Sequence, residues 1–183
     1  GPDIAYWSGQ VTAKTKPSGL RIARTREEIR RVYEQGPESC MSGIFDGIHP
    51  TECYATPDLG VAYVVGSTDK PTARAVVSFT EDGSPEYYGR LYGDSYRLRD
   101  ELEEAGFRSS RNAWEFMEGK RLLKIVDENE DRVVGPYVDS YCHYGYEGEG
   151  GYIFLTHDED DRVQWVFHNT SGFATSISPC TCS

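Results

Sequence analysis

A thiol and an imidazole lie close together in the first third of the sequence. Cys40 is part of the Gly- and Ser-containing segment Ser39–Gly43, and His49 follows nine residues after it. A cysteine with a histidine base is an arrangement used for nucleophilic catalysis. Such pairs are defined by geometry, which a connection of this length does not fix. Cys40 is equally suited to the core as a small apolar side chain, so both interpretations stay open.

Sulfur and imidazole ligands recur near the end of the sequence, where they are candidates for binding zinc. Cys142 and His143 are adjacent, while Cys180 and Cys182 are separated by one residue. Zinc is held by thiolates and imidazoles, which usually come in pairs two to four residues apart. Because the Cys180–Cys182 spacing is shorter than that, we expect no cofactor, with zinc on these four residues as the alternative.

Two carboxylates, Glu147 and Glu149, lie in the Tyr- and Gly-rich segment Tyr141–Gly151. Such a pair suits a site that orients a sugar hydroxyl and stabilises an oxocarbenium-like centre. The alternative is a solvated loop whose acids serve solubility. The acidic run Asp158–Asp161 lacks the spacing and central glycine of a calcium loop and is expected to be a solvated turn. The sequence holds no phosphate-cradling glycine loop, nucleophile elbow or His-Glu-x-x-His helix.

Two helices are predicted among the elements that position these residues. Thr25 and Glu28 form a capping box for a helix over Arg26–Gln35, which Gly36-Pro37 ends. Ser95 can cap a second helix over Tyr96–Ala105, in which Leu98, Leu102 and Ala105 form one apolar stripe.

Strands are predicted from short apolar runs bounded by turn residues. The segment Asp58–Val65 fits a short helix, its part Val61–Val65 fits a strand as well, and Tyr141–Gly151 is predicted to be a loop. The last two strands are expected to form a hairpin. The predicted strands are Leu20–Ala23, Glu52–Ala55, Thr72–Phe79, Arg121–Val126, Val133–Asp139, Tyr152–Thr156 and Val163–His168.

The order of these elements predicts an α+β fold. Several strands follow one another at the end of the chain, which favours a mixed or antiparallel sheet with two to four helices over a doubly wound one. Residues 1–19 are expected to form a flexible or extended arm, residues 20–177 a single domain, and residues 178–183 a tail.

The chain is acidic, with a net charge of −11. A field of that sign repels nucleic acid and anionic membranes and favours a protein partner with a basic surface. The charge is uneven, because five arginines crowd Arg21–Arg31 while acids gather at Asp100–Glu104, Asp127–Asp131 and His157–Asp161. The five cysteines show no framework spacing, and no apolar run approaches the length of a membrane span. These features predict a cytoplasmic protein.

A series of short segments runs along most of the chain, from Arg24 to about Phe173: Gly36–Gly43, His49-Pro50, Tyr54–Asp58, Ala73–Val77, Arg90–Gly93 and Gly135–Asp139. Read in this order, they resemble uncharacterised proteins of tailed bacteriophages. This resemblance implies a phage or prophage origin and the cytoplasm of the host cell, and it implies no known activity.

A second pattern is similar to ADP-ribosyltransferase-like folds. Cys53–Asp58, Ala62-Tyr63 and the strand Ala73–Phe79 resemble their passage of strand, Thr or Ser, helix and strand. The resemblance implies NAD as the substrate, Arg21 or Arg24 as the residue that holds its phosphates, and Glu149 as the catalytic acid. The sequence departs from this family because it has no Ser-Thr-Ser strand in the middle.

The leading hypothesis is a non-enzymatic, phage-type accessory protein that binds a host or phage macromolecule through an acidic surface, as an inhibitor of a host factor or of host defence. An NAD-using transferase, a zinc-binding domain and a structural component of the virion are the alternatives. The candidate binding residues are Tyr144, Tyr146, Asp158, Glu159, Asp160 and Asp161.

Overall fold

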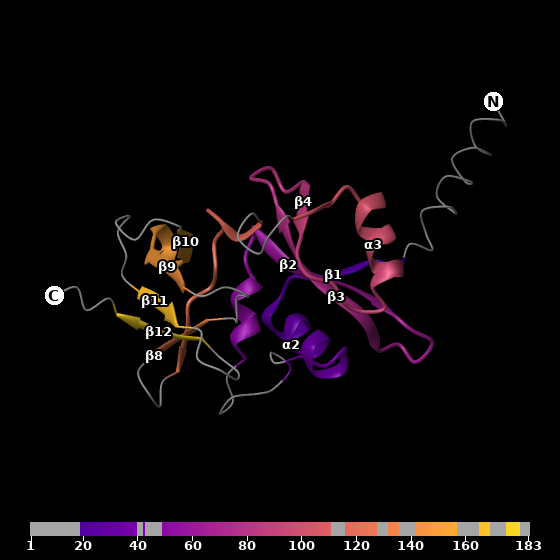
Figure 1. The fold of residues 1–183 in the computed structure, drawn as a ribbon, viewed down its shortest axis with the longest axis horizontal. Helices are drawn as coiled ribbons and strands as arrows, with labels where there is room; N and C mark the ends of the chain where they lie inside the picture. The colour runs from indigo at the N-terminus through magenta and orange to yellow at the C-terminus, as the bar shows by residue number, and fades with distance from the viewer. Residues whose placement is uncertain are drawn as a thin grey trace.

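The computed structural model describes residues 19–39, 42, 49–110, 116–127, 132–135, 142–156, 165–168 and 175–179. It has an α+β fold in which two sheets and two α-helices form the described part (Figure 1). The fold class predicted from the sequence is therefore confirmed. None of the helices in these segments is long and apolar enough to cross a membrane.

The first sheet is mixed, with the order β1-β2-β3-β4-β6, and β5 pairs with β3 beside β4. The pairs are antiparallel except for β4 and β6, which run parallel. Its strands are β1 (Arg21–Ala23), β2 (Leu59–Val65), β3 (Pro71–Phe79), β4 (Pro85–Tyr88), β5 (Tyr92–Gly93) and β6 (Arg108–Ser109).

The second sheet is antiparallel throughout, with the order β10-β9-β11-β12-β8-β7. An isolated bridge between Leu122 and Ile153 brings the segment before β7 against β10. The strands are β7 (Ile125–Asp127), β8 (Arg132–Gly135), β9 (Cys142–Glu147), β10 (Ile153–Thr156), β11 (Trp165–His168) and β12 (Thr175–Pro179).

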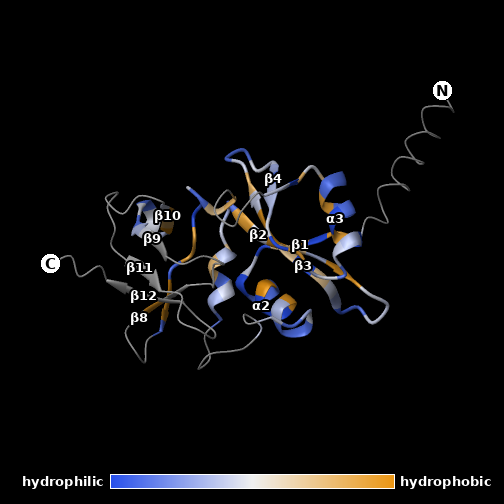
Figure 2. Ribbon diagram, in the orientation of Figure 1, coloured by the Kyte–Doolittle hydropathy of each residue, from blue (hydrophilic) through white to orange (hydrophobic). Residues whose placement is uncertain are grey.

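Both faces of the first sheet are covered, which explains why β2 and β3 are apolar almost without interruption. On one face, here called the α3 face, Ala62, Ala75 and Val77 pack with Leu98 and Leu102 of the helix α3 (Ser95–Glu104). Figure 2 shows the same packing, because the apolar side of α3 is turned toward the strands.

The opposite face, here called the α2 face, packs against the helix α2 (Arg26–Gln35) and the short 3-10 helix η1 (Pro50–Tyr54). Its core joins Val61 and Tyr63 of β2 to Ile29 and Val32 of α2, and it continues to Leu155 of the second sheet. Alternate side chains of each strand point to opposite faces, so neighbouring residues serve different cores.

The predicted N-terminus of α2 is confirmed. The Thr25 hydroxyl accepts from the Glu28 amide at 3.2 Å, and the Glu28 carboxylate accepts from the Thr25 amide at 3.3 Å. Gly36 ends the helix, where its amide donates to the Val32 carbonyl at 3.0 Å. The second helix is confirmed as α3, but Asp94 rather than Ser95 is its N-cap residue, and Ser95 is its first helical residue.

Several local predictions are wrong or now resolved. Leu59–Val65 is a strand and not a helix, because it pairs with β1 on one side and β3 on the other. Glu52–Ala55, predicted as a strand, belongs largely to η1, which begins at Pro50, where the fixed φ of proline suits a first helical turn. Ser178 and Pro179, the first two residues of the predicted tail, lie in β12 (Thr175–Pro179).

The predicted loop Tyr141–Gly151 contains the strand β9, whose tyrosines favour extended backbone. The short helix η2 (Glu149–Gly151) turns β9 into β10, and Gly150 and Gly151 both adopt φ of 75° there. The predicted hairpin between Tyr152–Thr156 and Val163–His168 is wrong, because β9 lies between the two strands β10 and β11 in the sheet.

Candidate functional site

The arginines of α2 hold a buried carboxylate. The Glu52 side chain is only 3% exposed, and it accepts hydrogen bonds at 2.8 Å from the Nε atoms of both Arg26 and Arg30. A carboxylate removed from water in this way needs paired cations to offset the loss of hydration. These two arginines therefore anchor η1 to α2.

Two arginines at or next to the edge strand β1 also make contacts within the fold. Arg24 donates to the Pro57 carbonyl at 3.0 Å and lies 4.0 Å above the centre of the Phe79 ring. Arg21 lies on β1 and pairs with Asp69 at 3.5 Å. The Arg-rich stretch of the sequence is thus largely occupied by contacts within the fold.

Arg74 is the largest of the fully buried side chains among the described residues, with 1% of its surface exposed. Its guanidinium lies 4.3 Å from the centre of the Tyr33 ring and 4.8 Å from that of Tyr92. It donates to the Pro37 carbonyl and, at 2.6 Å, to the Ser39 hydroxyl. Burial raises the pKa of Tyr33 to about 12, so the phenol stays neutral beside the cation. Arg74 therefore ties the segment after α2 to the centre of the sheet.

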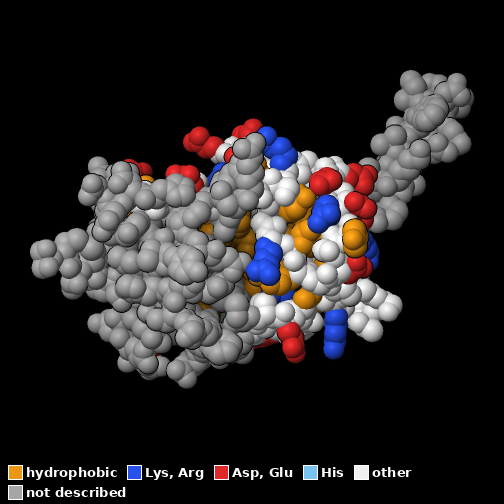
Figure 3. Space-filling view, viewed as in Figure 1, with side chains coloured by type: hydrophobic (Ala, Val, Ile, Leu, Met, Phe, Trp, Pro, Cys, Tyr) orange, Lys and Arg blue, Asp and Glu red, His pale blue; other side chains and the backbone are white. Residues whose placement is uncertain are grey.

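A pocket of about 760 Å³ opens between α3 and the chain that leaves β4. Basic side chains lie beside hydrophobic ones on the surface over this region (Figure 3). The pocket is lined by Tyr88, Gly89, Arg90, Leu91, Ser95, Arg99, Glu103, Ser109, Ser110 and Phe116.

An irregularity in strand pairing forms one wall of this pocket. Tyr88 pairs with Val77 and Tyr92 pairs with Arg74, so three residues on the pocket side oppose two residues of β3. An extra residue of this kind bends a strand and commonly occurs beside functional sites. Gly89 is at the start of the bend, where an added Cβ would lie 2.7 Å from the Phe116 ring. A side chain at this position would therefore displace the Phe116 ring from the wall.

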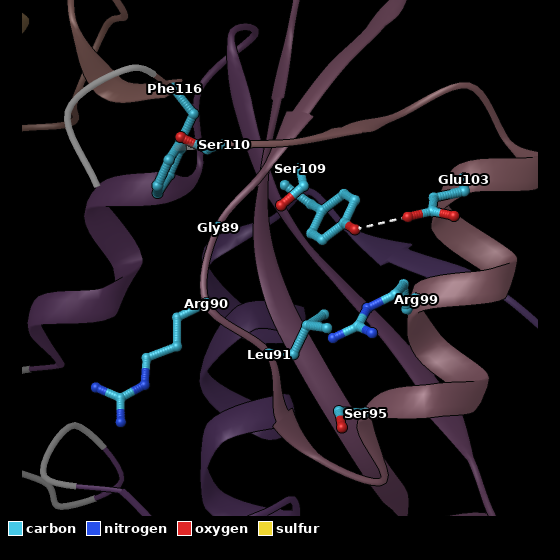
Figure 4. A pocket seen from close by; sticks show the side chains of 10 residues that line it. Gly89, Arg90, Leu91, Ser95, Arg99, Glu103, Ser109, Ser110 and Phe116 are labelled. Atoms are coloured by element: carbon cyan, nitrogen blue, oxygen red, sulfur yellow. Dashed lines mark hydrogen bonds between the residues drawn. The ribbon is translucent and has the colours of Figure 1, made fainter. Parts of the chain in front are cut away.

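Arg99 projects from α3 toward Leu91 inside the pocket (Figure 4). The side chain is exposed, and its guanidinium makes no ion pair with any residue that the structure describes. Arg90 extends away from the other lining side chains in the same view, and its guanidinium lies 5.4 Å from the centre of the Tyr92 ring. Arg99 is therefore the cation that faces the open pocket.

Glu103 lies one helical turn beyond Arg99, and Tyr88 holds it in place. The Tyr88 hydroxyl donates to Glu103 Oε1 at 3.0 Å (Figure 4). Burial, followed by this hydrogen bond, raises the pKa of Tyr88, so its hydroxyl keeps the proton that it donates. The pocket thus presents a cation and an anchored carboxylate on the same helix.

The residues predicted for an NAD-using site lie on different sheets. Arg21 is on β1 of the first sheet, whereas Glu149 is an exposed residue at the start of η2, between β9 and β10. Glu147 pairs with Lys124 at 3.3 Å, and the Tyr146 ring stacks on Phe154 at 5.6 Å. The β9–β10 turn is therefore built on ordinary packing contacts.

His49 is buried, and its Nδ1 lies 2.7 Å from the Thr51 hydroxyl, while Cys40, its predicted partner, lies outside the described residues. Burial lowers the pKa of His49 and raises that of the Cys53 thiol well above its ordinary value. A buried thiol with a raised pKa is a poor nucleophile. Cys53 is a core residue.

The remaining predicted residues fall on parts of the chain that the structure describes incompletely. Cys142, His143 and Tyr144 are on β9, whose backbone alone is described there, and Asp158, Glu159, Asp160, Asp161, Cys180 and Cys182 lie outside the described residues. Within the described segments, no three His, Cys, Asp or Glu side chains gather as metal ligands do. The zinc hypothesis and the acidic protein-binding surface stay predictions.

The pocket was not predicted from the sequence, although one signal was present. Arg99 and Glu103 are four residues apart within the predicted helix Tyr96–Ala105, and its predicted cap Ser95 lies four residues before Arg99, which places the three on one face. That spacing says nothing of what lies opposite the helix.

No protein-family model matches the chain, and no curated protein or solved structure is significantly similar to it.

Proposed function

We propose that this protein is a binding domain for a small anionic ligand, which it holds in the pocket beside α3. The observation that carries the proposal is the guanidinium of Arg99, which faces the pocket without a carboxylate partner among the described residues. A guanidinium offers a planar set of donors that matches carboxylate and phosphate oxygens. The pocket volume also lies in the range of small-molecule sites.

The surroundings of Arg99 support an anion rather than a neutral ligand. Ser95 and Ser109 line the same pocket, and a serine hydroxyl can donate a hydrogen bond to an oxyanion. Leu91 and Phe116 supply an apolar wall, which excludes water from one side of the ligand. Excluding water strengthens the attraction between the guanidinium and an anion.

The protein as a whole has a charge of −11, so a bound anion must be attracted locally. Because Arg99 is exposed, that attraction is screened by salt, with a Debye length of about 8 Å at physiological ionic strength. We therefore expect modest affinity for a bare anion, with a dissociation constant on the order of 1 mM, and weaker binding as salt is raised.

Titration of the isotopically labelled protein with inorganic phosphate, followed by NMR, tests the proposal. Shifts are expected at residues around the pocket, and Arg99→Gln should weaken binding at least about tenfold, since it removes a charge-assisted contact. Arg97→Gln is the matched control, because Arg97 is on the same helix and donates to the Val65 carbonyl at 3.0 Å, outside the pocket. Equal losses in both variants, or shifts confined to other surfaces, would refute the proposal.

A further inference from the structure

Along the pocket wall formed by α3, the lining side chains change from hydrogen-bond donors to an acceptor. Ser95, Arg99 and Glu103 follow one another at intervals of four residues and all line the pocket. One turn of helix advances about 5.4 Å, so the three side chains form a row of roughly 12 Å along the wall. The row begins with a hydroxyl and a cation and ends with a carboxylate. A ligand lying along it meets donors at one end and an acceptor at the other.

Arg99 and Glu103 do not neutralise each other. Side chains four residues apart on a helix commonly form an ion pair, yet these two are not within 4.0 Å of one another. Tyr88 accounts for this, because its hydroxyl holds Glu103 Oε1 at 3.0 Å while Arg99 extends toward Leu91 (Figure 4). Each charged group is therefore available to a different part of a ligand.

We propose that the ligand is a phosphate monoester of a sugar or other polyol, with its phosphate on Arg99 and Ser95 and a hydroxyl donating to Glu103. This inference rests on the proposed function, since it needs an anion at Arg99. A carboxylate at the far end of the row repels a second anionic group and accepts from a hydroxyl. A molecule with phosphates at both ends does not fit this polarity.

Hydroxyl groups match the rest of the wall better than an ammonium does. Ser109 lines the pocket between Gly89 and Glu103 in the view of Figure 4, and a serine hydroxyl both donates and accepts. A polyol exchanges both kinds of hydrogen bond with such side chains, whereas an ammonium only donates. The Phe116 ring and Leu91 can cover the apolar C–H face of a sugar ring.

Two probes separate the anion from the polyol. Isothermal titration or NMR should give ribose 5-phosphate an affinity at least about ten times that of inorganic phosphate, the gain coming from hydrogen bonds to a charged acceptor. Glu103→Gln should remove most of this difference while leaving inorganic phosphate as well bound or better bound. Glu104→Gln is the matched control, since Glu104 is exposed on the same helix and does not line the pocket. That control should leave both affinities unchanged.

The outcomes distinguish the ligand class from the proposed function. If inorganic phosphate binds through Arg99 but ribose 5-phosphate binds no tighter, or Glu103→Gln does not weaken it, the polyol is wrong and the anion site stands. Tighter binding of the zwitterion glycylglycine than of ribose 5-phosphate would replace the polyol with an ammonium-bearing ligand. If neither phosphate binds to the folded protein, both proposals fail. Thermal melting of each variant confirms that it is folded.

Discussion

The arginines on the two faces of the first sheet differ in whether they are paired with other groups of the protein. On the α2 face, Arg74 is buried between two tyrosines, and Arg26 and Arg30 close on the buried Glu52. On the α3 face, Arg99 faces a pocket with no carboxylate against it among the described residues. The difference separates arginines that hold the fold together from one that is free to bind a ligand.

The uneven charge of the sequence does not mark the site. Five arginines crowd Arg21–Arg31, but Arg21, Arg24, Arg26 and Arg30 are all engaged within the fold. A cation already paired adds little attraction for a partner outside. The cluster of arginines in the sequence is thus a poor guide to an anion-binding site. Arg99, a single arginine on α3, is the better candidate.

The largest expected effect comes from the carboxylate on the α2 face. Glu52→Gln should lower the free energy of unfolding by about 3 kcal/mol, because it leaves two guanidiniums facing a neutral amide in a buried position. Urea denaturation measures the loss. Glu34→Gln is the control, since Glu34 is exposed on α2, and it should change stability by less than about 0.5 kcal/mol. Similar losses for the two variants would show that Glu52 is not an anchor.

Arg74→Met should have the next largest effect and lower the free energy of unfolding by about 2 kcal/mol. Methionine keeps apolar volume between Tyr33 and Tyr92 but removes the cation and leaves the Pro37 carbonyl without its donor. Urea denaturation gives the value, and Arg108→Met serves as a control because Arg108 lies 4.9 Å over the Tyr87 ring at the exposed edge strand β6. A neutral or stabilising result for Arg74→Met would mean that the buried charge costs as much as its contacts contribute.

Local sequence signals predicted much of the fold. The capping box at Thr25 and the β-branched run of β3 determine their elements through nearest neighbours alone, and both are confirmed. The hairpin prediction failed because strand order depends on which partner lies opposite, and the glycines in and after β9 made that strand read as a loop. Local propensity does not contain that information.

The candidate site was harder to predict than the fold. The helix carrying Ser95, Arg99 and Glu103 was identified, but the pocket exists because an irregular β4–β5 connection and Phe116 lie opposite that helix. The spacing of four residues is common on solvated helices, so it carries weight only once the facing wall is known. Contacts between distant segments decide which charged side chains are already paired.

Asp58→Asn tests another engaged arginine and adds a dependence on pH. Asp58 accepts from Arg121 Nε and Nη2 at 2.8 Å and from the Arg121 amide at 2.9 Å, and these bonds lower the pKa of its carboxyl. The variant should lose about 1.5 kcal/mol at pH 7. A lowered pKa in the folded state means that the stabilisation is complete above about pH 4 and is lost as the pH falls further.

Urea midpoints of the wild type and Asp58→Asn measured between pH 7 and pH 3 check this expectation. The two curves should run parallel at neutral pH and converge in acid, as the wild-type carboxyl takes up a proton and its bonds to Arg121 weaken. A constant gap across the whole range would show that the ionised form of Asp58 is not what Arg121 stabilises.

Substitution of Arg99 should have the smallest effect on stability. It tests directly whether Arg99 on the α3 face differs from the structural arginines of the α2 face. Arg99→Gln removes a cation that contacts no carboxylate among the described residues, so the free energy of unfolding should change by less than about 0.5 kcal/mol while phosphate binding is lost. Arg30→Gln should show the reverse, with weakened folding and unchanged binding, because Arg30 is committed to Glu52. If Arg99→Gln destabilised the protein as much as Arg30→Gln, Arg99 would be one more structural arginine, and the two faces of the sheet would not differ.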